Sequence, residues 1–126
     1  ILSDGELDEG SNWEAIMLAS HHKLDNLVII IDYNKYQSLT TVEQTLNLEP
    51  LKDKFISFGA AVTIVDGHSH SELVNGFNEK SSFKPHVLIC NTIKGKGVSF
   101  MENKVLWHYK NPSREEYLQA QEELSN

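Results

Sequence analysis

Short, nearly continuous apolar runs alternate along the chain with segments whose apolar residues recur at helical spacing. The runs are rich in branched side chains, a pattern typical of parallel strands that helices cover on both faces. The predicted strands are 27–32, 61–65 and 86–91, and Ile1-Leu2 is interpreted as the end of a further strand. The predicted helices run from residue 11 to about 24, from 50 to about 58, from 69 to about 80 and from 113 to about 124. This alternation predicts βαβ units, and so an α/β fold built on a parallel sheet.

The starts of the predicted helices carry recognisable capping signals. Three of them pair a serine with a glutamate three residues later, namely Ser11 with Glu14, Ser69 with Glu72, and Ser113 with Glu116. In such a capping box, each side chain accepts a hydrogen bond from the backbone N–H of the other residue. The fourth helix has Pro50 in its first turn, and Gly59 ends it. The polar segments 33–47 and 94–111 are predicted to be loops.

Composition narrows the class of protein. The 126 residues suffice for one domain or part of one, and 40% of them are apolar, which is enough for a core. No apolar run reaches the length of a membrane span, and the single cysteine, Cys90, fits a reducing compartment, which we interpret as the cytoplasm. The net charge of −7 argues against nucleic-acid binding, which needs a basic surface. An anionic cofactor stays possible, because a metal ion can supply positive charge locally.

Polar residues that could carry chemistry follow the predicted strands. Because crossovers between parallel strands are right-handed, the loops after the strands share one edge of the sheet, where ligands bind in open α/β folds. The residues that follow strands in this way are Asp4, Asn34, Asp66 and Lys94. Asp4 with Gly5, and Asn34 thirty positions after Asp4, could offer oxygen ligands to a Mg²⁺ ion that holds a diphosphate. Taken singly, each is more simply a turn residue.

The same residues resemble the thiamin diphosphate motif of the transketolase family, an Asp-Gly pair followed about thirty residues later by Asn. Further segments extend the resemblance in the family's order, namely 10–15, 66–68, 92–97 and 107–112. The likeness is to the separately encoded N-terminal subunit of split transketolases. It implies a three-layer α/β fold, a parallel sheet flanked by helices, with residues 1–126 forming a diphosphate-binding domain that lacks its N-terminal portion.

The resemblance also implies roles for individual residues. The metal would be Mg²⁺, and its ligands would be the side chains of Asp4 and Asn34 and the main-chain carbonyl of Tyr36. The thiamin diphosphate would be bound by the same three residues together with Gly5, Glu6 and His108. The catalytic residues would be His108, near the diphosphate and the donor substrate, and Glu9, in a carboxylate network between two cofactor sites. Glu14 matches a second family glutamate but is also explained as a capping residue. Ser3 departs from the glycine that the family usually has before the Asp.

The function implied is transfer of a two-carbon ketol unit between sugar phosphates, by an enzyme that this chain forms with a pyrimidine-domain subunit, as a homodimer or heterotetramer. The chain is expected to be inactive without that partner. Two alternatives are another thiamin enzyme, such as a 1-deoxyxylulose-phosphate synthase-like ketol transferase, and a non-catalytic α/β interaction module. The remaining candidates have plainer explanations. His68 and His70 lack the further ligands of a zinc site, Asp66-Gly67-His68 is not interpreted as catalytic, and Lys94 and Lys96 are as well explained by a solvated loop.

Overall fold

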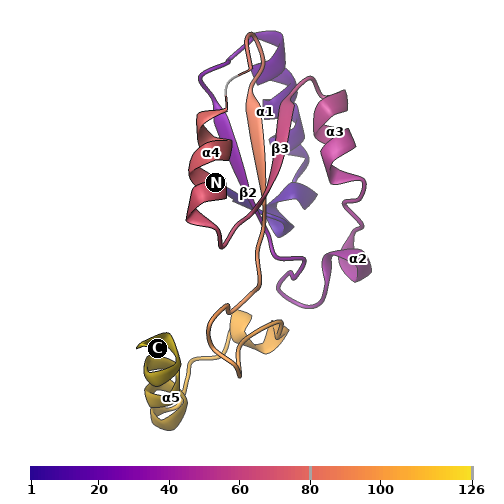
Figure 1. The fold of residues 1–126 in the computed structure, drawn as a ribbon. Coiled ribbons are helices and arrows are strands. Elements are labelled where there is room, and N and C mark those ends of the chain that lie inside the picture. Colours follow the sequence, from indigo (N-terminus) through magenta and orange to yellow (C-terminus); the bar gives the residue numbers. More distant parts are fainter. Residues whose placement is uncertain (80, 126) are drawn as a thin grey trace.

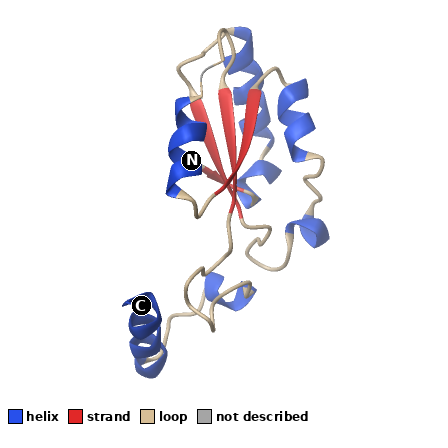
Figure 2. Ribbon diagram, viewed as in Figure 1, coloured by secondary structure: helices blue, strands red, loops and turns tan. Residues whose placement is uncertain are grey.

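The structure of the chain is a computed structural model that describes residues 1–79 and 81–125. Strands and helices alternate, as Figures 1 and 2 show. The strands are β1 (Leu2–Ser3), β2 (Val28–Tyr33), β3 (Ala61–Asp66) and β4 (His86–Asn91). The α-helices are α1 (Gly10–His21), α2 (Val42–Thr45), α3 (Leu51–Ser57), α4 (His70–Asn78) and α5 (Arg114–Ser125). Two 3₁₀ helices, η1 (Gly5–Asp8) and η2 (Val105–His108), complete this part of the chain.

The four strands form one parallel sheet in the order β1-β2-β4-β3. The last strand of the sequence, β4, therefore lies between β2 and β3, and its residues 86–90 are all buried. Asn91 at its end is aligned with Tyr33 on one side and with Asp66 on the other. The carboxyl ends of the strands consequently meet at one edge, which confirms the predicted parallel sheet.

Helices cover both faces of the sheet, so the predicted three-layer arrangement is confirmed (Figure 1). On one face, Ile16 of α1 and Phe55 of α3 pack into a core with Ile31 and Val87 of the central strands. On the other face, Leu73 of α4 packs against a smaller cluster of strand residues. The members of that cluster are Val65, Leu88 and Cys90, with Ile30 beside them. Burial of these side chains is the main favourable contribution to the stability of the fold.

Several helix boundaries differ from the predictions. The first helix begins at Gly10 with Glu9 at its N-cap and without a side-chain capping bond, so the capping box predicted for Ser11 and Glu14 is wrong. The second box is half formed: Ser69 Oγ accepts the Glu72 N–H at 3.3 Å, while the Glu72 carboxylate accepts the Asp66 N–H at 2.8 Å. That helix ends at Asn78, and its predicted end at residue 80 lies outside the described residues.

The third capping box is confirmed. Ser113 Oγ accepts the Glu116 N–H at 3.2 Å, and the Glu116 carboxylate accepts the Ser113 N–H at 2.7 Å. The helix that it starts, α5, lies with η2 beyond the carboxyl edge of the sheet (Figure 1). Glu123 of α5 accepts hydrogen bonds from the N–H and the hydroxyl of Ser99, at 2.6 and 2.7 Å, and so fastens this helix to the loop after β4.

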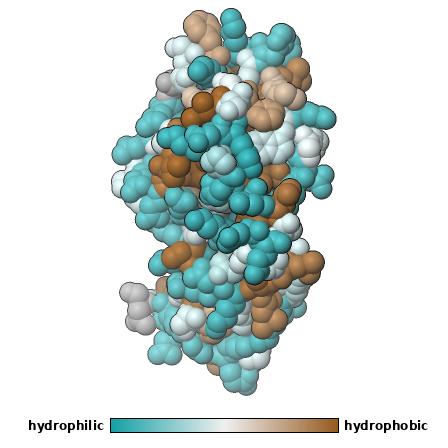
Figure 3. All heavy atoms as spheres, turned by 90° about the vertical axis from the view of Figure 1, so that its right-hand side faces the viewer, coloured by the Kyte–Doolittle hydropathy of each residue, from teal (hydrophilic) through white to brown (hydrophobic). Residues whose placement is uncertain are grey.

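Hydrophilic groups predominate on the face drawn in Figure 3, with smaller apolar patches among them. Within residues 1–79 and 81–125, none of the helices has both the length and the hydropathy needed to cross a membrane.

Candidate functional site

Asp4 joins the loops that follow β1 and β2. Although it is charged, only 1% of its surface is exposed. One carboxylate oxygen, Oδ1, accepts the Gly5 N–H at 2.8 Å, and the other, Oδ2, accepts the Lys35 N–H at 2.7 Å. The second of these bonds spans 31 positions of sequence and brings Asp4 against the residue that follows Asn34. The predicted proximity of Asp4 and the Asn34 loop is therefore confirmed.

The backbone of Lys35 is unusual, and this conformation forms part of the link. Its φ is 66°, in the left-handed region that residues with a side chain seldom occupy. Such a conformation persists only where the surroundings hold it, and it is common at ligand sites. Here it accompanies the Lys35 N–H bond to Asp4 and a bond from the Val42 N–H to the Lys35 carbonyl at 3.0 Å. Nothing in the sequence reveals it, because Gly or Asn is the usual residue in this conformation.

Burial makes the Asp4 carboxylate electrostatically incomplete. Burial is the main cause that raises the pKa of Asp4 above its ordinary value, and the nearby negative charge of Asp32 acts in the same direction. The bonds from Lys35 and Gly5 oppose this rise, and the charge of Lys94 opposes it least. Within the described residues, no cationic side chain forms a salt bridge with Asp4. A buried carboxylate without a cation is costly, so a bound metal ion would complete its environment.

Asn34 and Tyr36 form a tight turn directly after β2. The Asn34 side-chain oxygen accepts the Tyr36 N–H at 2.9 Å. Tyr36 also pairs with Thr41 through an isolated β-bridge, which closes the loop on itself. Together with Asp4, the turn offers a carboxylate, an amide oxygen and a main-chain carbonyl. This donor set is composed entirely of oxygen, as Mg²⁺ requires, and each side-chain oxygen that accepts one N–H keeps a further lone pair.

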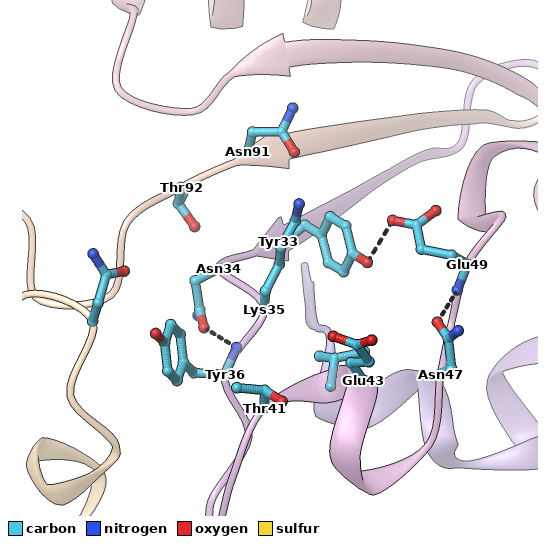
Figure 4. A pocket seen from close by; sticks show the side chains of 12 residues that line it. Tyr33, Asn34, Lys35, Tyr36, Thr41, Glu43, Asn47, Glu49, Asn91 and Thr92 are labelled. Atoms are coloured by element: carbon cyan, nitrogen blue, oxygen red, sulfur yellow. Dashed lines mark hydrogen bonds between the residues drawn. The ribbon is translucent and has the colours of Figure 1, made fainter.

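Two hollows meet at Asn34 and Thr92. The larger has a volume of about 690 Å³ and lies between the ends of β2 and β4 and the loop that contains α2 (Figure 4). It is lined by Tyr33, Asn34, Lys35, Tyr36, Thr41, Val42, Glu43, Asn47, Glu49, Asn91, Thr92 and Asn103. The smaller, of about 360 Å³, is lined by Asp32, Asn34, His68, Thr92, Ile93, Lys94 and Gly95. Asn34 therefore faces space on both sides, and a ligand at the sheet edge could contact it from either.

A hydrogen bond from Tyr33 to Glu49 fastens the far wall of the larger hollow to the sheet. The Tyr33 hydroxyl donates to Glu49 Oε1 at 2.8 Å, and Glu49 Oε2 accepts the Leu51 N–H at 3.0 Å (Figure 4). The Leu51 bond and then the Tyr33 bond lower the pKa of Glu49. Burial, followed by the bond to Glu49, raises the pKa of Tyr33 well above its ordinary value. The loop between β2 and α3 is thus held at both ends.

Gly5 and Glu6 lie in the turn beside Asp4. A Cβ atom at Gly5 would meet Gln37 Cγ at 3.6 Å, an ordinary contact, so packing within this chain does not itself demand glycine there. Glu6 is exposed, and its carboxylate accepts the N–H and the hydroxyl of Ser3, at 2.8 and 3.0 Å. These two bonds lower the pKa of Glu6. Ser3, the departure from the family's glycine, therefore helps to close the turn.

Glu9 and His108 lie outside both hollows. Glu9 is exposed at the N-cap of α1, and its N–H donates to the Glu6 carbonyl at 3.2 Å. His108 is exposed at the end of η2, where its ring meets the Tyr109 ring edge-on at 4.8 Å between centroids. The structure thus groups Asp4, Asn34 and Tyr36, whereas Glu9 and His108 stand apart from them.

Sequence reasoning missed residues that the fold places beside Asn34. Thr92 lines both hollows, and its hydroxyl donates to the Asp32 carboxylate. His68 lines the smaller hollow and accepts the Ile93 N–H at 2.8 Å through Nε2. The position of each after or near a strand end was the only signal in the sequence, and that signal does not reveal which backbone groups they contact.

Comparison with known proteins identifies the family. The sequence pattern of the family described as "Transketolase, thiamine diphosphate binding domain" matches residues 1–124. One of the two subunits of apulose-4-phosphate transketolase from Phocaeicola vulgatus is 41% identical over 127 residues, covering 99% of this chain and 45% of the relative. The 6-deoxy-6-sulfo-D-fructose transketolase subunit from a Clostridium species is also 41% identical, over 98% of this chain and 46% of its own length. The chain thus spans about half the length of these curated relatives.

A solved structure supports the same assignment. The crystal structure of transketolase from Campylobacter jejuni superimposes with a TM-score of 0.87 and 32% identity, covering 98% of this chain and 20% of the other. Human transketolase is 40% identical over 110 residues, which cover 87% of this chain and 18% of the enzyme. Sequence pattern, relatives and fold all agree that the chain belongs to the transketolase family and carries its thiamin diphosphate-binding domain.

Proposed function

We propose that this chain supplies the diphosphate- and Mg²⁺-binding part of a thiamin diphosphate-dependent transketolase, which transfers a two-carbon ketol unit between sugar phosphates. The observation that carries the proposal is the 2.7 Å hydrogen bond from the Lys35 N–H to the buried Asp4 carboxylate. This bond holds two loops together at the sheet edge, where Asn34 and Tyr36 add further oxygen donors.

The proposed metal ligands are Asp4, Asn34 and the main-chain carbonyl of Tyr36. Mg²⁺ demands near-octahedral oxygen coordination and keeps several sites for water or phosphate, so three protein donors leave room for a diphosphate. Gly5 would let the backbone approach that diphosphate, because this chain places only an ordinary contact where its side chain would be. Glu6 would act through the turn that it closes with Ser3.

When bound, thiamin diphosphate supplies the nucleophilic carbanion that such ketol transfers need, and the protein binds and orients it. His108 is proposed to approach the diphosphate or donor substrate, and Glu9 to join a carboxylate network. Both lie outside the two hollows, so we propose that a partner chain brings them into use. Their exposure in this chain is consistent with such contacts.

The proposed partner carries the pyrimidine-binding domain, in a homodimeric or heterotetrameric assembly in the cytoplasm. The support comes from relatives whose names describe them as subunits of transketolases. Those relatives are named for apulose 4-phosphate and for a sulfonated fructose, so the sugar chemistry varies among similar chains. Sugar phosphates are the class we propose here, with activity only in the assembled enzyme.

The metal site can be tested by calorimetric titration of thiamin diphosphate in the presence of Mg²⁺, in the enzyme assembled with its complementary subunit. Asp4→Ala and Asn34→Ala should each abolish Mg²⁺-dependent binding, because the remaining oxygens cannot hold an ion that gives up its water reluctantly. Asp4→Asn keeps the volume of the side chain and one hydrogen-bond acceptor while removing the charge, so it should also lose binding without unfolding.

Exposed residues of the same types provide matched controls. Asp8→Ala and Asn26→Ala change exposed positions away from the sheet edge and should leave the affinity unchanged. Circular dichroism of each variant separates loss of the site from loss of the fold. Unchanged cofactor affinity in Asp4→Asn or Asn34→Ala would show that the metal ligands are assigned wrongly.

A further inference from the structure

The Asp66-Gly67-His68 turn after β3 meets the segment that leaves β4. The Gly67 N–H donates to the Asn91 carbonyl at 2.8 Å, and a Cβ atom at Gly67 would lie only 2.4 Å from Thr92 Cγ2. The next residue, His68, accepts the Ile93 N–H through Nε2 at 2.8 Å. The turn thus contacts three successive residues of the chain just where it passes Asn34.

Two successive N–H groups fix the course of this segment between its neighbours. The Thr92 N–H donates to the Tyr33 carbonyl on the β2 side at 3.3 Å, and the Ile93 N–H donates to His68 on the β3 side. Lys94 and Gly95 follow immediately and line the smaller hollow with Asn34. Loss of either bond would free one side of the segment that forms this wall.

His68 is itself held rigidly enough to position something else. Its own N–H donates to Asp66 Oδ1 at 2.8 Å, and the Asp66 N–H donates to the Glu72 carboxylate at 2.8 Å. The Ser69 N–H donates to the Asp66 carbonyl at 3.1 Å as α4 begins. The imidazole therefore extends from a turn that is anchored to both the strand and the helix.

We propose that His68 is a positioning residue, which fixes Thr92–Gly95 beside Asn34 by accepting the Ile93 N–H and thereby raises the affinity of the site for thiamin diphosphate. The inference rests on the proposed function. Since Nε2 accepts this bond, the neutral imidazole carries its proton on Nδ1. Nε2 is then engaged and does not serve as a catalytic base.

The test compares substitutions that keep or lose the acceptor. In Gln, the side-chain oxygen lies as many bonds from Cα as Nε2 of His, whereas in Asn it corresponds to Nδ1. In the assembled enzyme with Mg²⁺, His68→Ala should weaken thiamin diphosphate binding about 3- to 10-fold, the range for one lost hydrogen bond. His68→Asn should behave like His68→Ala, and His68→Gln should return to within about two-fold of the parent. His70→Ala, at an exposed histidine two residues away, should have no effect.

A second readout does not depend on the cofactor. Amide hydrogen exchange at Ile93 should be faster in His68→Ala than in the parent and should recover in His68→Gln, while circular dichroism stays unchanged. If the parent enzyme binds no thiamin diphosphate, the proposed function is wrong and this inference falls with it. If the parent binds it and His68→Ala binds equally well, or His68→Gln is as weak as His68→Ala, only the positioning role is wrong.

Discussion

Substitution of Tyr33 by Phe should weaken the attachment of the loop between β2 and α3 without disturbing the core. The ring of Tyr33 is 5% exposed and stays in place as Phe, so only the 2.8 Å bond to Glu49 is removed. A hydrogen bond to a charged group contributes about 1.5–3 kcal/mol, but Glu49 is exposed and water can replace the donor. We therefore expect a loss of about 1 kcal/mol in the free energy of unfolding.

Urea denaturation followed by circular dichroism measures this difference. With an m-value of about 2 kcal/mol/M, the loss corresponds to a midpoint about 0.5 M lower. The effect should also depend on pH. Because the pKa of Glu49 lies below its ordinary value of 4.5, the ionised carboxylate stabilises the fold above that pH, and this contribution disappears as the pH falls through the lowered pKa. The gap between parent and Tyr33→Phe should therefore narrow below about pH 4.5.

Tyr117→Phe is the matched control, since Tyr117 lies on the exposed helix α5 and is 48% exposed. It should leave the midpoint unchanged at both neutral and acidic pH. An equal midpoint for the parent and Tyr33→Phe at pH 7, or a gap that widens on acidification, would refute this reasoning about Glu49.

Two further predictions concern packing. Phe55→Ala should lower the free energy of unfolding by about 3–5 kcal/mol, because this side chain is fully buried, whereas Ile56→Ala, at a 49% exposed neighbour, should cost under about 1 kcal/mol. Equal urea midpoints for the two variants would contradict the assigned core. Gly67→Ala should cost about 1–3 kcal/mol through the clash with Thr92, whereas Gly10→Ala, with no neighbouring atom within 4 Å, should cost less; melting temperatures of the two variants decide.

The strands were well predicted because their signal is local. Branched apolar residues fill 27–32, and the strand is Val28–Tyr33; the predicted strand 86–91 is β4 without change. The start of α1 was missed because a tertiary contact overrides the capping pattern there. The Asn12 side chain donates to the Glu6 carbonyl at 2.6 Å, and the helix begins one residue before Ser11. Short α2, inside the predicted loop 33–47, is only four residues long and has no periodicity to detect.

The candidate site was predictable where side chains of known chemistry follow strands. Asp4 and Asn34 were placed together by this reasoning, and the hydrogen bond from Lys35 to Asp4 confirms their proximity. The left-handed backbone of Lys35 and the contact between His68 and Ile93 were not predictable. Both depend on which backbone N–H groups face a side chain across the sheet edge, and residue types alone do not determine that.

The place of β4 in the sheet has a consequence for the order in which the protein folds. During synthesis, β2 and β3 emerge first, yet neither pairs with the other in the finished sheet, because β4 lies between them. The long-range pairings that complete the sheet become available only after residue 91 has been made, and such non-local contacts form slowly. Until then, the nascent chain exposes the apolar strand edges that chaperones recognise. The halves of the cofactor site carried by Asn34 and His68 are consequently assembled in a single late step.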